Sequence, residues 1–98
     1  MEVRLEIAGR SVILRYTVNA MCAVEDAAGG ALDNVMERQF TAARLLLWGG
    51  MLDKAPETPL SEAGRLIGEH LAQGGTLDEI VEACAEAMRR AGFFGKAA

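Results

Sequence analysis

The side chains that could carry out chemistry are few and lie far apart in the sequence. His70 is the only histidine, and Cys22 and Cys84 are the only cysteines. A nucleophilic triad needs a base beside its nucleophile, and a structural zinc site needs about four ligands, so this set is a poor start for either. We expect His70 to share a solvated helix face with Glu69, and we predict no catalytic residues and no metal site.

The glycine pairs and the carboxylates give no stronger sign of catalysis. Gly29-Gly30, Gly49-Gly50 and Gly74-Gly75 lack the lysine and hydroxyl of a phosphate-binding loop, so they indicate helix ends. The fourteen acidic residues fall almost entirely on expected outer helix faces, where burial cannot raise a pKa into the range of a general acid. The sequence therefore predicts no enzyme and no cofactor. A deep pocket lined by His70 and two carboxylates would change that interpretation.

The size and charge of the chain narrow the class of protein. Ninety-eight residues suffice for one domain, and interspersed charges with a net value of −4 argue against a nucleic-acid partner. The longest apolar run, around residues 45–52, is about half of the ~20 residues needed to cross a bilayer. Charges alternate through residues 2–6, unlike a secretory signal. We expect a cytoplasmic protein, outside the membrane, whose two cysteines are reduced and buried.

The elements that must position any site begin with a hairpin. Apolar residues alternate with charged ones before Gly9-Arg10, and the alternation resumes after it. If Gly9-Arg10 is a two-residue turn, three apolar pairs share one surface. These pairs are Ile7 with Val12, Leu5 with Leu14, and Val3 with Tyr16. Residues 2–16 therefore predict a half-buried antiparallel β-hairpin.

Helical patterns account for most of the remaining chain. Together with the hairpin, five predicted helices give an α+β fold with a single domain. Thr17, Thr41 and Ser61 are the expected N-caps of three helices, and Thr76 with Glu79 predicts a capping box before the last one. The expected helices span residues 18–28, 31–38, 41–52, 61–73 and 76–91.

The spacing of apolar residues predicts which helix faces point inward. The third helix is apolar on nearly all sides, so we place it at the centre with Trp48 as a core anchor. Its Gly49-Gly50 pair could also reflect fraying or the close approach of another backbone. Residues 53–59 hold both prolines and form the expected main loop. The expected inward residues of the other helices are Val18, Met21 and Cys22, then Leu32, Val35 and Met36, then Leu60, Ala63, Gly64, Ile67 and Leu71, then Leu77, Ile80, Val81, Cys84 and Met88.

Surfaces that could bind a protein lie near the two ends of the chain. Ile13 is a large apolar residue on the polar face of the hairpin, whose strand edges are open to strand addition. The alternative is that Ile13 is a singly exposed apolar residue that needs no explanation. Phe93 and Phe94 cannot both face inward from one regular helix, so one of them is available to a partner. The candidate interface residues are Ile13, Arg15, Phe93 and Phe94.

Several segments in combination resemble a known family. They are the hairpin with Gly9 at its turn, the run Leu14-Arg15-Tyr16-Thr17, the segment from Ala20 to Glu25 with a glycine pair before Leu32, the segment Trp48-Gly49-Gly50, and the closing helix that ends at Phe93. With these features the chain resembles the small tail proteins of gene transfer agents, which are related to phage tail assembly chaperones. The likeness extends over most of the chain.

The resemblance implies a non-enzymatic role. Proteins similar to this one hold the long tape-measure protein soluble during tail assembly and help to bring tail-tube subunits to it, so these two proteins are the implied partners. A tube subunit would need extended β-sheet to close rings, which one hairpin and five helices do not offer. The alternative function is a cytoplasmic adaptor or regulatory module that binds one helical partner. The sequence leaves homo-oligomerisation open.

Overall fold

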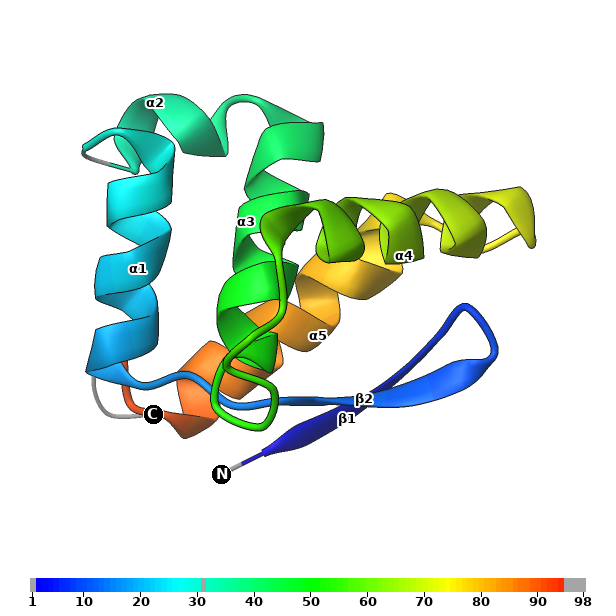
Figure 1. The fold of residues 1–98 in the computed structure, drawn as a ribbon, viewed down its shortest axis with the longest axis horizontal. Coiled ribbons are helices and arrows are strands. Elements are labelled where there is room, and N and C mark those ends of the chain that lie inside the picture. Colours follow the sequence, from blue (N-terminus) through cyan, green and yellow to red (C-terminus); the bar gives the residue numbers. More distant parts are fainter. Residues whose placement is uncertain (1, 31, 95–98) are drawn as a thin grey trace.

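The computed structural model describes residues 2–30 and 32–94, and these form an N-terminal hairpin followed by helices (Figure 1). The predicted α+β fold, a two-stranded antiparallel hairpin packed with five helices, is confirmed over this range. In Figure 1, α3 stands at the centre, with α1 to its left, α4 to its right and the hairpin below. The elements are β1 (Val3–Ile7), β2 (Arg10–Leu14), α1 (Val18–Ala28), α2 (Asp33–Met36), α3 (Gln39–Met51), α4 (Leu60–Ala72) and α5 (Leu77–Arg90).

The hairpin turns one residue earlier than the sequence suggests. Its turn is Ala8-Gly9 rather than Gly9-Arg10, and Leu5 therefore lies opposite Val12. Both turn residues have positive φ, 53° at Ala8 and 74° at Gly9, which is the combination that a type I′ turn requires. The predicted pairs are wrong by two positions. A shift of two keeps every side chain on its own face, so the apolar surface of the hairpin is preserved.

The first and last helices begin where their capping residues predict. Before α1, the Thr17 hydroxyl accepts a hydrogen bond of 3.0 Å from the Ala20 N–H. Before α5, the Glu79 N–H donates to the Thr76 hydroxyl at 3.2 Å, and the Glu79 carboxylate accepts from the Thr76 N–H at 2.6 Å. These reciprocal bonds confirm the predicted capping box.

The predicted starts of α3 and α4 are wrong. α3 begins at Gln39, so Thr41 lies inside its first turn. α4 begins at Leu60, so Ser61 is not its cap. The residue before α4 is Pro59, whose missing N–H costs no helical hydrogen bond at a helix start. The proline, rather than the serine, therefore fixes where this helix begins.

Gly49 and Gly50 lie inside α3, so the prediction of a helix end at this pair is wrong. A Cβ atom at Gly49 would lie 2.4 Å from Cγ2 of Val24, and a Cβ atom at Gly50 would lie 3.0 Å from atoms of Leu14 and Tyr16. The pair therefore permits a close approach, although the nearest atoms belong to side chains rather than to another backbone. The missing side chains let α1 and the end of the hairpin pack directly on α3.

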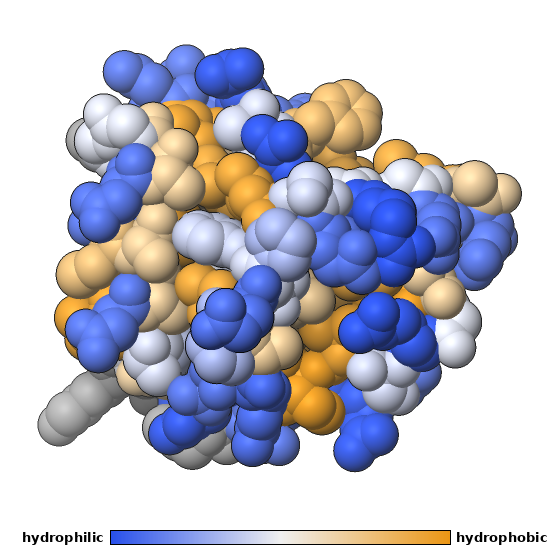
Figure 2. Space-filling view, in the orientation of Figure 1, coloured by the Kyte–Doolittle hydropathy of each residue, from blue (hydrophilic) through white to orange (hydrophobic). Residues whose placement is uncertain are grey.

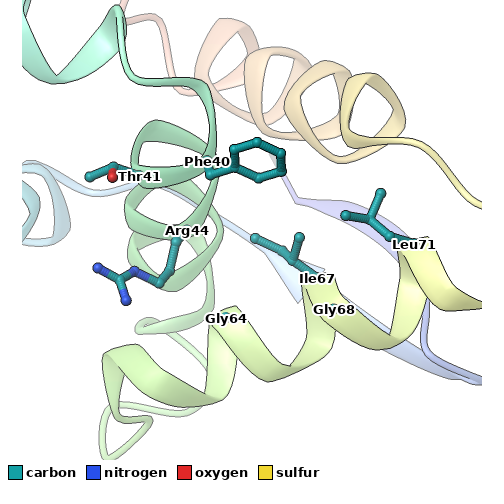
Figure 3. Close-up of a pocket in the computed structure, with 7 residues that line it drawn as sticks. All are labelled: Phe40, Thr41, Arg44, Gly64, Ile67, Gly68 and Leu71. Atoms are coloured by element: carbon teal, nitrogen blue, oxygen red, sulfur yellow. The ribbon is translucent and has the colours of Figure 1, made fainter.

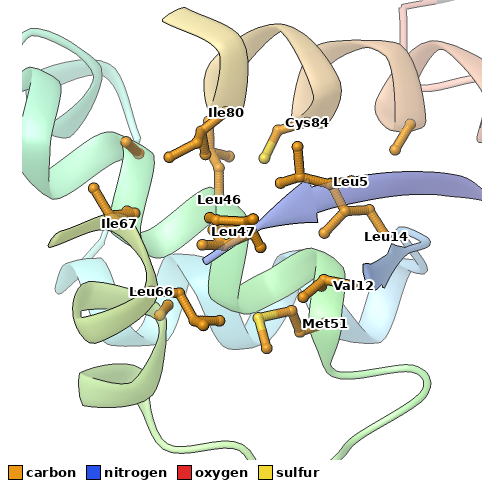
Figure 4. Close-up of a cluster of buried hydrophobic side chains, with 14 of the residues drawn as sticks. Leu5, Val12, Leu14, Leu46, Leu47, Met51, Leu66, Ile67, Ile80 and Cys84 are labelled. Atoms are coloured by element: carbon orange, nitrogen blue, oxygen red, sulfur yellow. The ribbon is translucent and has the colours of Figure 1, made fainter. Parts of the chain in front are cut away.

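The core gathers around α3 (Figure 4). Leu47 of this helix is fully buried among side chains from the hairpin, α4 and α5. Tyr16 adds a polar group, because its buried hydroxyl donates to the Leu46 carbonyl at 2.5 Å. Burial raises the pKa of Tyr16 well above its ordinary value. The largest fully buried side chains are Ile7, Leu14, Val24, Leu47, Leu66, Ile80 and Cys84, and Leu66 was absent from the predicted inward set.

Trp48 anchors the loop between α3 and α4. Its indole Nε1 donates to the Thr58 carbonyl at 2.8 Å, and its ring is only partly buried. The predicted main loop, residues 53–59, lies between these two helices. Trp48 therefore holds this loop at the edge of the core instead of filling the centre.

The two ends of the described chain meet on the hairpin side of the core. Arg90, at the end of α5, donates from Nη1 to the Glu2 carbonyl at 2.9 Å. Phe93 packs edge-to-face on Tyr16, with ring centroids 6.5 Å apart. α5 contacts both strands, and it covers the apolar face of the hairpin together with α3 and α4.

The inward face of α1 differs from the predicted one. Ala20 and Val24 are buried, whereas Val18 is 70% exposed and Cys22 is also exposed. The reason lies in α3, where Gly49 leaves room for Val24. The prediction that both cysteines are buried is therefore correct for Cys84 and wrong for Cys22.

This difference between the thiols gives a testable expectation. In the native protein, Ellman's reagent should modify one thiol per chain, at Cys22, and the second thiol only after denaturant is added. Cys84 is fully buried, and burial raises its pKa to about 11, so little reactive thiolate forms there. The Cys22→Ser variant should lose the native reaction. Two thiols that react at similar rates in the native protein would contradict this arrangement.

Candidate protein-binding groove

His70 lies in a shallow depression between the hairpin turn and the connection from α4 to α5. The depression has a volume of about 310 Å³, and its lining includes His70 with the carboxylates of Glu6 and Glu79. His70 Nε2 lies 3.1 Å from Glu79 Oε1, and a Cβ atom at Gly75 would lie 2.2 Å from the same nitrogen. Glu6 accepts a 2.6 Å hydrogen bond from the Ser11 hydroxyl. A histidine and two carboxylates therefore do come together, each with a local partner.

The electrostatics of this cluster favour a structural role. The Thr76 backbone N–H and then His70 lower the pKa of Glu79 below its ordinary value. A carboxyl group that acts as a general acid near neutral pH needs a raised pKa instead. The same carboxylate completes the capping box of α5, so its ionised form is used by the fold. We infer that the contact between His70 and Glu79 stabilises the packing of α4 against the start of α5.

Acid should therefore weaken the contacts that Glu79 makes with His70 and Thr76, and so destabilise the fold. Because the pKa of Glu79 is lowered in the folded state, its contribution is present above the unfolded value of about 4.3 and is lost as the pH falls through the folded value. Between pH 5 and pH 3, the melting temperature of the wild type should fall more steeply than that of Glu79→Gln, whose amide can still cap the helix. An equal fall in melting temperature between pH 5 and pH 3 in the two proteins would contradict this role.

Within 2–30 and 32–94, no group of three or more histidine, cysteine, aspartate or glutamate side chains is arranged to hold a metal ion. No helix in the same ranges has the length and apolar character needed to cross a bilayer.

The four predicted interface residues are exposed to different degrees. Phe94 is 61% exposed, and Ile13 is partly exposed on the outer face of the hairpin. Arg15 pairs with Asp53 at 3.2 Å, and Phe93 is partly buried against Tyr16. Among the described residues, no hydrogen bond, ion pair or ring contact joins two of the four. Their role in binding stays a prediction, and Phe94 is the most accessible of them.

A more continuous apolar surface lies between α3 and α4. Here a groove of about 340 Å³ opens beside the N-terminal half of α3. The Phe40 ring and the side chains of Ile67 and Leu71 point into the same space (Figure 3). The residues that line it are Phe40, Thr41 and Arg44 of α3 and Gly64, Ile67, Gly68 and Leu71 of α4. We call this set the α3–α4 groove.

The local sequence explains how the groove forms. Phe40 is exposed at the N-terminal end of α3, before the buried Ala43 and Leu47, and Arg44 is exposed one helical turn after it. The Arg44 stem lies over α4, because a Cβ atom at Gly64 would be 3.2 Å from Arg44 Cδ. Gly68 on the facing side of α4 leaves the floor of the groove open, whereas the Arg44 stem covers Gly64.

The exposure of the groove is unusual for apolar side chains of this size. Phe40 is 68% exposed and Leu71 is 37% exposed, although Leu71 was predicted to face inward. On the other side of α3, a smaller hollow of about 190 Å³ adjoins Met36, which is 49% exposed and was also predicted to face inward. Figure 2 shows apolar side chains at the surface beside the N-terminal end of α3, with hydrophilic ones around them. Clustered exposed apolar groups of this kind are typical of binding surfaces.

Sequence reasoning missed this surface for an identifiable reason. A cap at Thr41 would leave Phe40 outside the third helix, whereas α3 begins at Gln39. With the helix starting at Gln39, Phe40 lies in its first turn and its ring stays exposed, although Leu47, two turns later on nearly the same side of the helix, is buried. The signal was an aromatic residue one turn before an arginine in a helix that looked apolar all round.

Comparison of the chain with protein-family models, with curated proteins and with solved structures gives no match. The site must therefore be interpreted from its own geometry.

Proposed function

We propose that this protein is a non-enzymatic tail assembly chaperone, of the phage or gene-transfer-agent type, that binds the tape-measure protein through the α3–α4 groove. The observation that carries the proposal is the exposed apolar side chains of Phe40 and Leu71 on the two walls of the groove. The choice of partner comes from the resemblance of the chain to gene-transfer-agent tail proteins. Assistance to the tail-tube protein and a cytoplasmic location belong to the same proposal.

The physical argument starts from what a tape-measure protein requires. A long helical protein has apolar stripes that would associate with one another before the tail is built, so a chaperone must cover these stripes and later release them. A groove between two helices suits the apolar face of a third helix. Each copy would bury only a small area, which favours reversible binding, and many copies along one client would add avidity.

The test is co-purification with fragments of a tape-measure protein, encoded by any long helical reading frame that is found beside this gene. We expect the wild type to retain such a fragment, and the double variant Phe40→Asp/Leu71→Asp to bind it at least about 30-fold more weakly, the loss expected for central interface residues. Both side chains are exposed, so the variant should keep its melting temperature within a few degrees.

The matched control is Ile13→Asp/Phe94→Asp, which places the same charges on the surfaces predicted from the sequence. If this control loses the fragment while the groove variant keeps it, the interface lies at the hairpin and the C-terminal aromatic residues. If the gene has no tail genes around it and the protein binds no tape-measure fragment, the chaperone proposal is wrong. Binding to one unrelated helical protein through the groove would then identify an adaptor.

A further inference from the structure

Nothing in the fold requires a glycine at position 68. It lies inside α4, it is exposed, and a Cβ atom added to it would meet nothing within 4 Å. Glycine weakens a helix interior relative to alanine, because it leaves more backbone freedom to be lost on folding. Gly64 differs, since its missing side chain makes room for the Arg44 stem. The open space above Gly68 belongs to the α3–α4 groove.

The groove combines the open space above Gly68 with the apolar side chains of Phe40 and Leu71. Gly64 and Gly68 are one turn apart on α4, and Ile67 lies between them on the groove floor. The side chains of Phe40 and Leu71 point into the same end of the groove (Figure 3). At Gly68 a second helix can approach closely, because no side chain there holds the two backbones apart, whereas the Arg44 stem fills the space at Gly64.

Arg44 supplies a charge at the other end of the groove. Its stem lies against Gly64, and its guanidinium points away from the Phe40 ring (Figure 3). Within the described residues, no carboxylate pairs with it, whereas Arg65 on the neighbouring face of α4 pairs with both Glu62 and Glu69. Phe40 and Arg44 are four residues apart on one helix, a rise of about 6 Å.

We propose that the α3–α4 groove takes an amphipathic helix with a defined pattern. An apolar side chain of that helix lies between Phe40 and Leu71, its backbone passes over Gly68, and an aspartate or glutamate three or four positions from the apolar residue pairs with Arg44. This inference rests on the proposed function only in requiring a protein partner, and it specifies which features of that partner are recognised.

The test uses the full chain labelled with ¹⁵N and synthetic 18-residue helical peptides. The peptides contain alanine, lysine and glutamine, one leucine stripe, and a glutamate either four positions before or four positions after the central leucine. We expect one of the two to shift the backbone amide signals of Gly64 and Gly68 saturably. Replacement of its glutamate by lysine should weaken binding at least about fivefold, and Arg44→Glu should reverse this preference.

Gly68→Ala separates recognition from folding. The substitution should raise the melting temperature by about 4 °C, because alanine favours the helix, and yet weaken peptide binding about tenfold by placing a methyl group in the groove. Ser61→Ala, on an exposed position of the same helix, is the matched control and should leave binding unchanged.

The outcomes distinguish this inference from the proposed function. Peptides that shift neither glycine signal at millimolar concentration, or that bind Gly68→Ala as well as wild type, would overturn the recognition pattern. Tape-measure binding that is lost in Phe40→Asp/Leu71→Asp but is indifferent to Gly68→Ala and Arg44→Glu would also overturn the pattern and leave the chaperone proposal standing. Binding of the patterned peptide without any tape-measure binding would support the pattern and reject the chaperone.

Discussion

Leu47→Ala should lower the free energy of unfolding by about 3–4 kcal/mol, the loss typical of a fully enclosed leucine. Leu47 is wholly buried at the centre of α3, where side chains of the hairpin, α4 and α5 converge on it (Figure 4). Removal of three carbon atoms there leaves a cavity that four different elements cannot close together. The measurement is urea denaturation followed by circular dichroism, with the slope of the transition compared between variants.

Leu71→Ala is the matched control for this experiment. It removes the same atoms from an exposed leucine of α4, so the free energy of unfolding should change by about 0.5 kcal/mol or less. Similar losses from the two substitutions would contradict the central position of Leu47. The control also has a use in binding assays, because Leu71 lines the α3–α4 groove.

Gly49→Ala should destabilise the protein by about 1–2 kcal/mol, although alanine is the better helix former. The new methyl group would lie 2.4 Å from Cγ2 of Val24, well inside the contact distance of two carbon atoms. Val24 is fully buried and β-branched, so its side chain has few other rotamers to adopt. The overlap must then push α1 away from α3.

A second substitution tests this cause directly. In a Val24→Ala background the overlap disappears, and Gly49→Ala should become stabilising by up to about 1 kcal/mol through helix propensity. Urea denaturation of the wild type, both single variants and the double variant gives the coupling energy. Additive effects would show that Val24 is not the obstacle, and that Gly49 is required for another reason.

Local signals in the sequence predicted the elements better than their contacts. The capping box of Thr76 and Glu79 located α5, and the alternation of residues 2–7 located the hairpin, because each depends on residues close in sequence. The hairpin register could not be obtained in the same way. A shift by two residues leaves the alternation unchanged, and the choice between turns depends on whether Ala8 adopts a positive φ.

The groove and the face of α1 required knowledge of tertiary packing. Val24 and Cys22 both occur among apolar residues, and only the gap at Gly49 decides that Val24 is the buried one. Phe40 and Leu71 are ordinary core residues by type, and their exposure follows from how α3 and α4 are oriented. The interface predicted from Ile13 and Phe94 and the α3–α4 groove are therefore separate hypotheses, based on different information.

The contact between the hairpin and α5 has a consequence for biosynthesis. The strands precede this helix, with 62 residues between Leu14 and Leu77. At roughly 5–20 residues per second, the ribosome needs about 3–12 seconds to add that stretch. During this interval the nascent hairpin has no α5 to cover its apolar side, so the fold can be completed only after α5 has been synthesised.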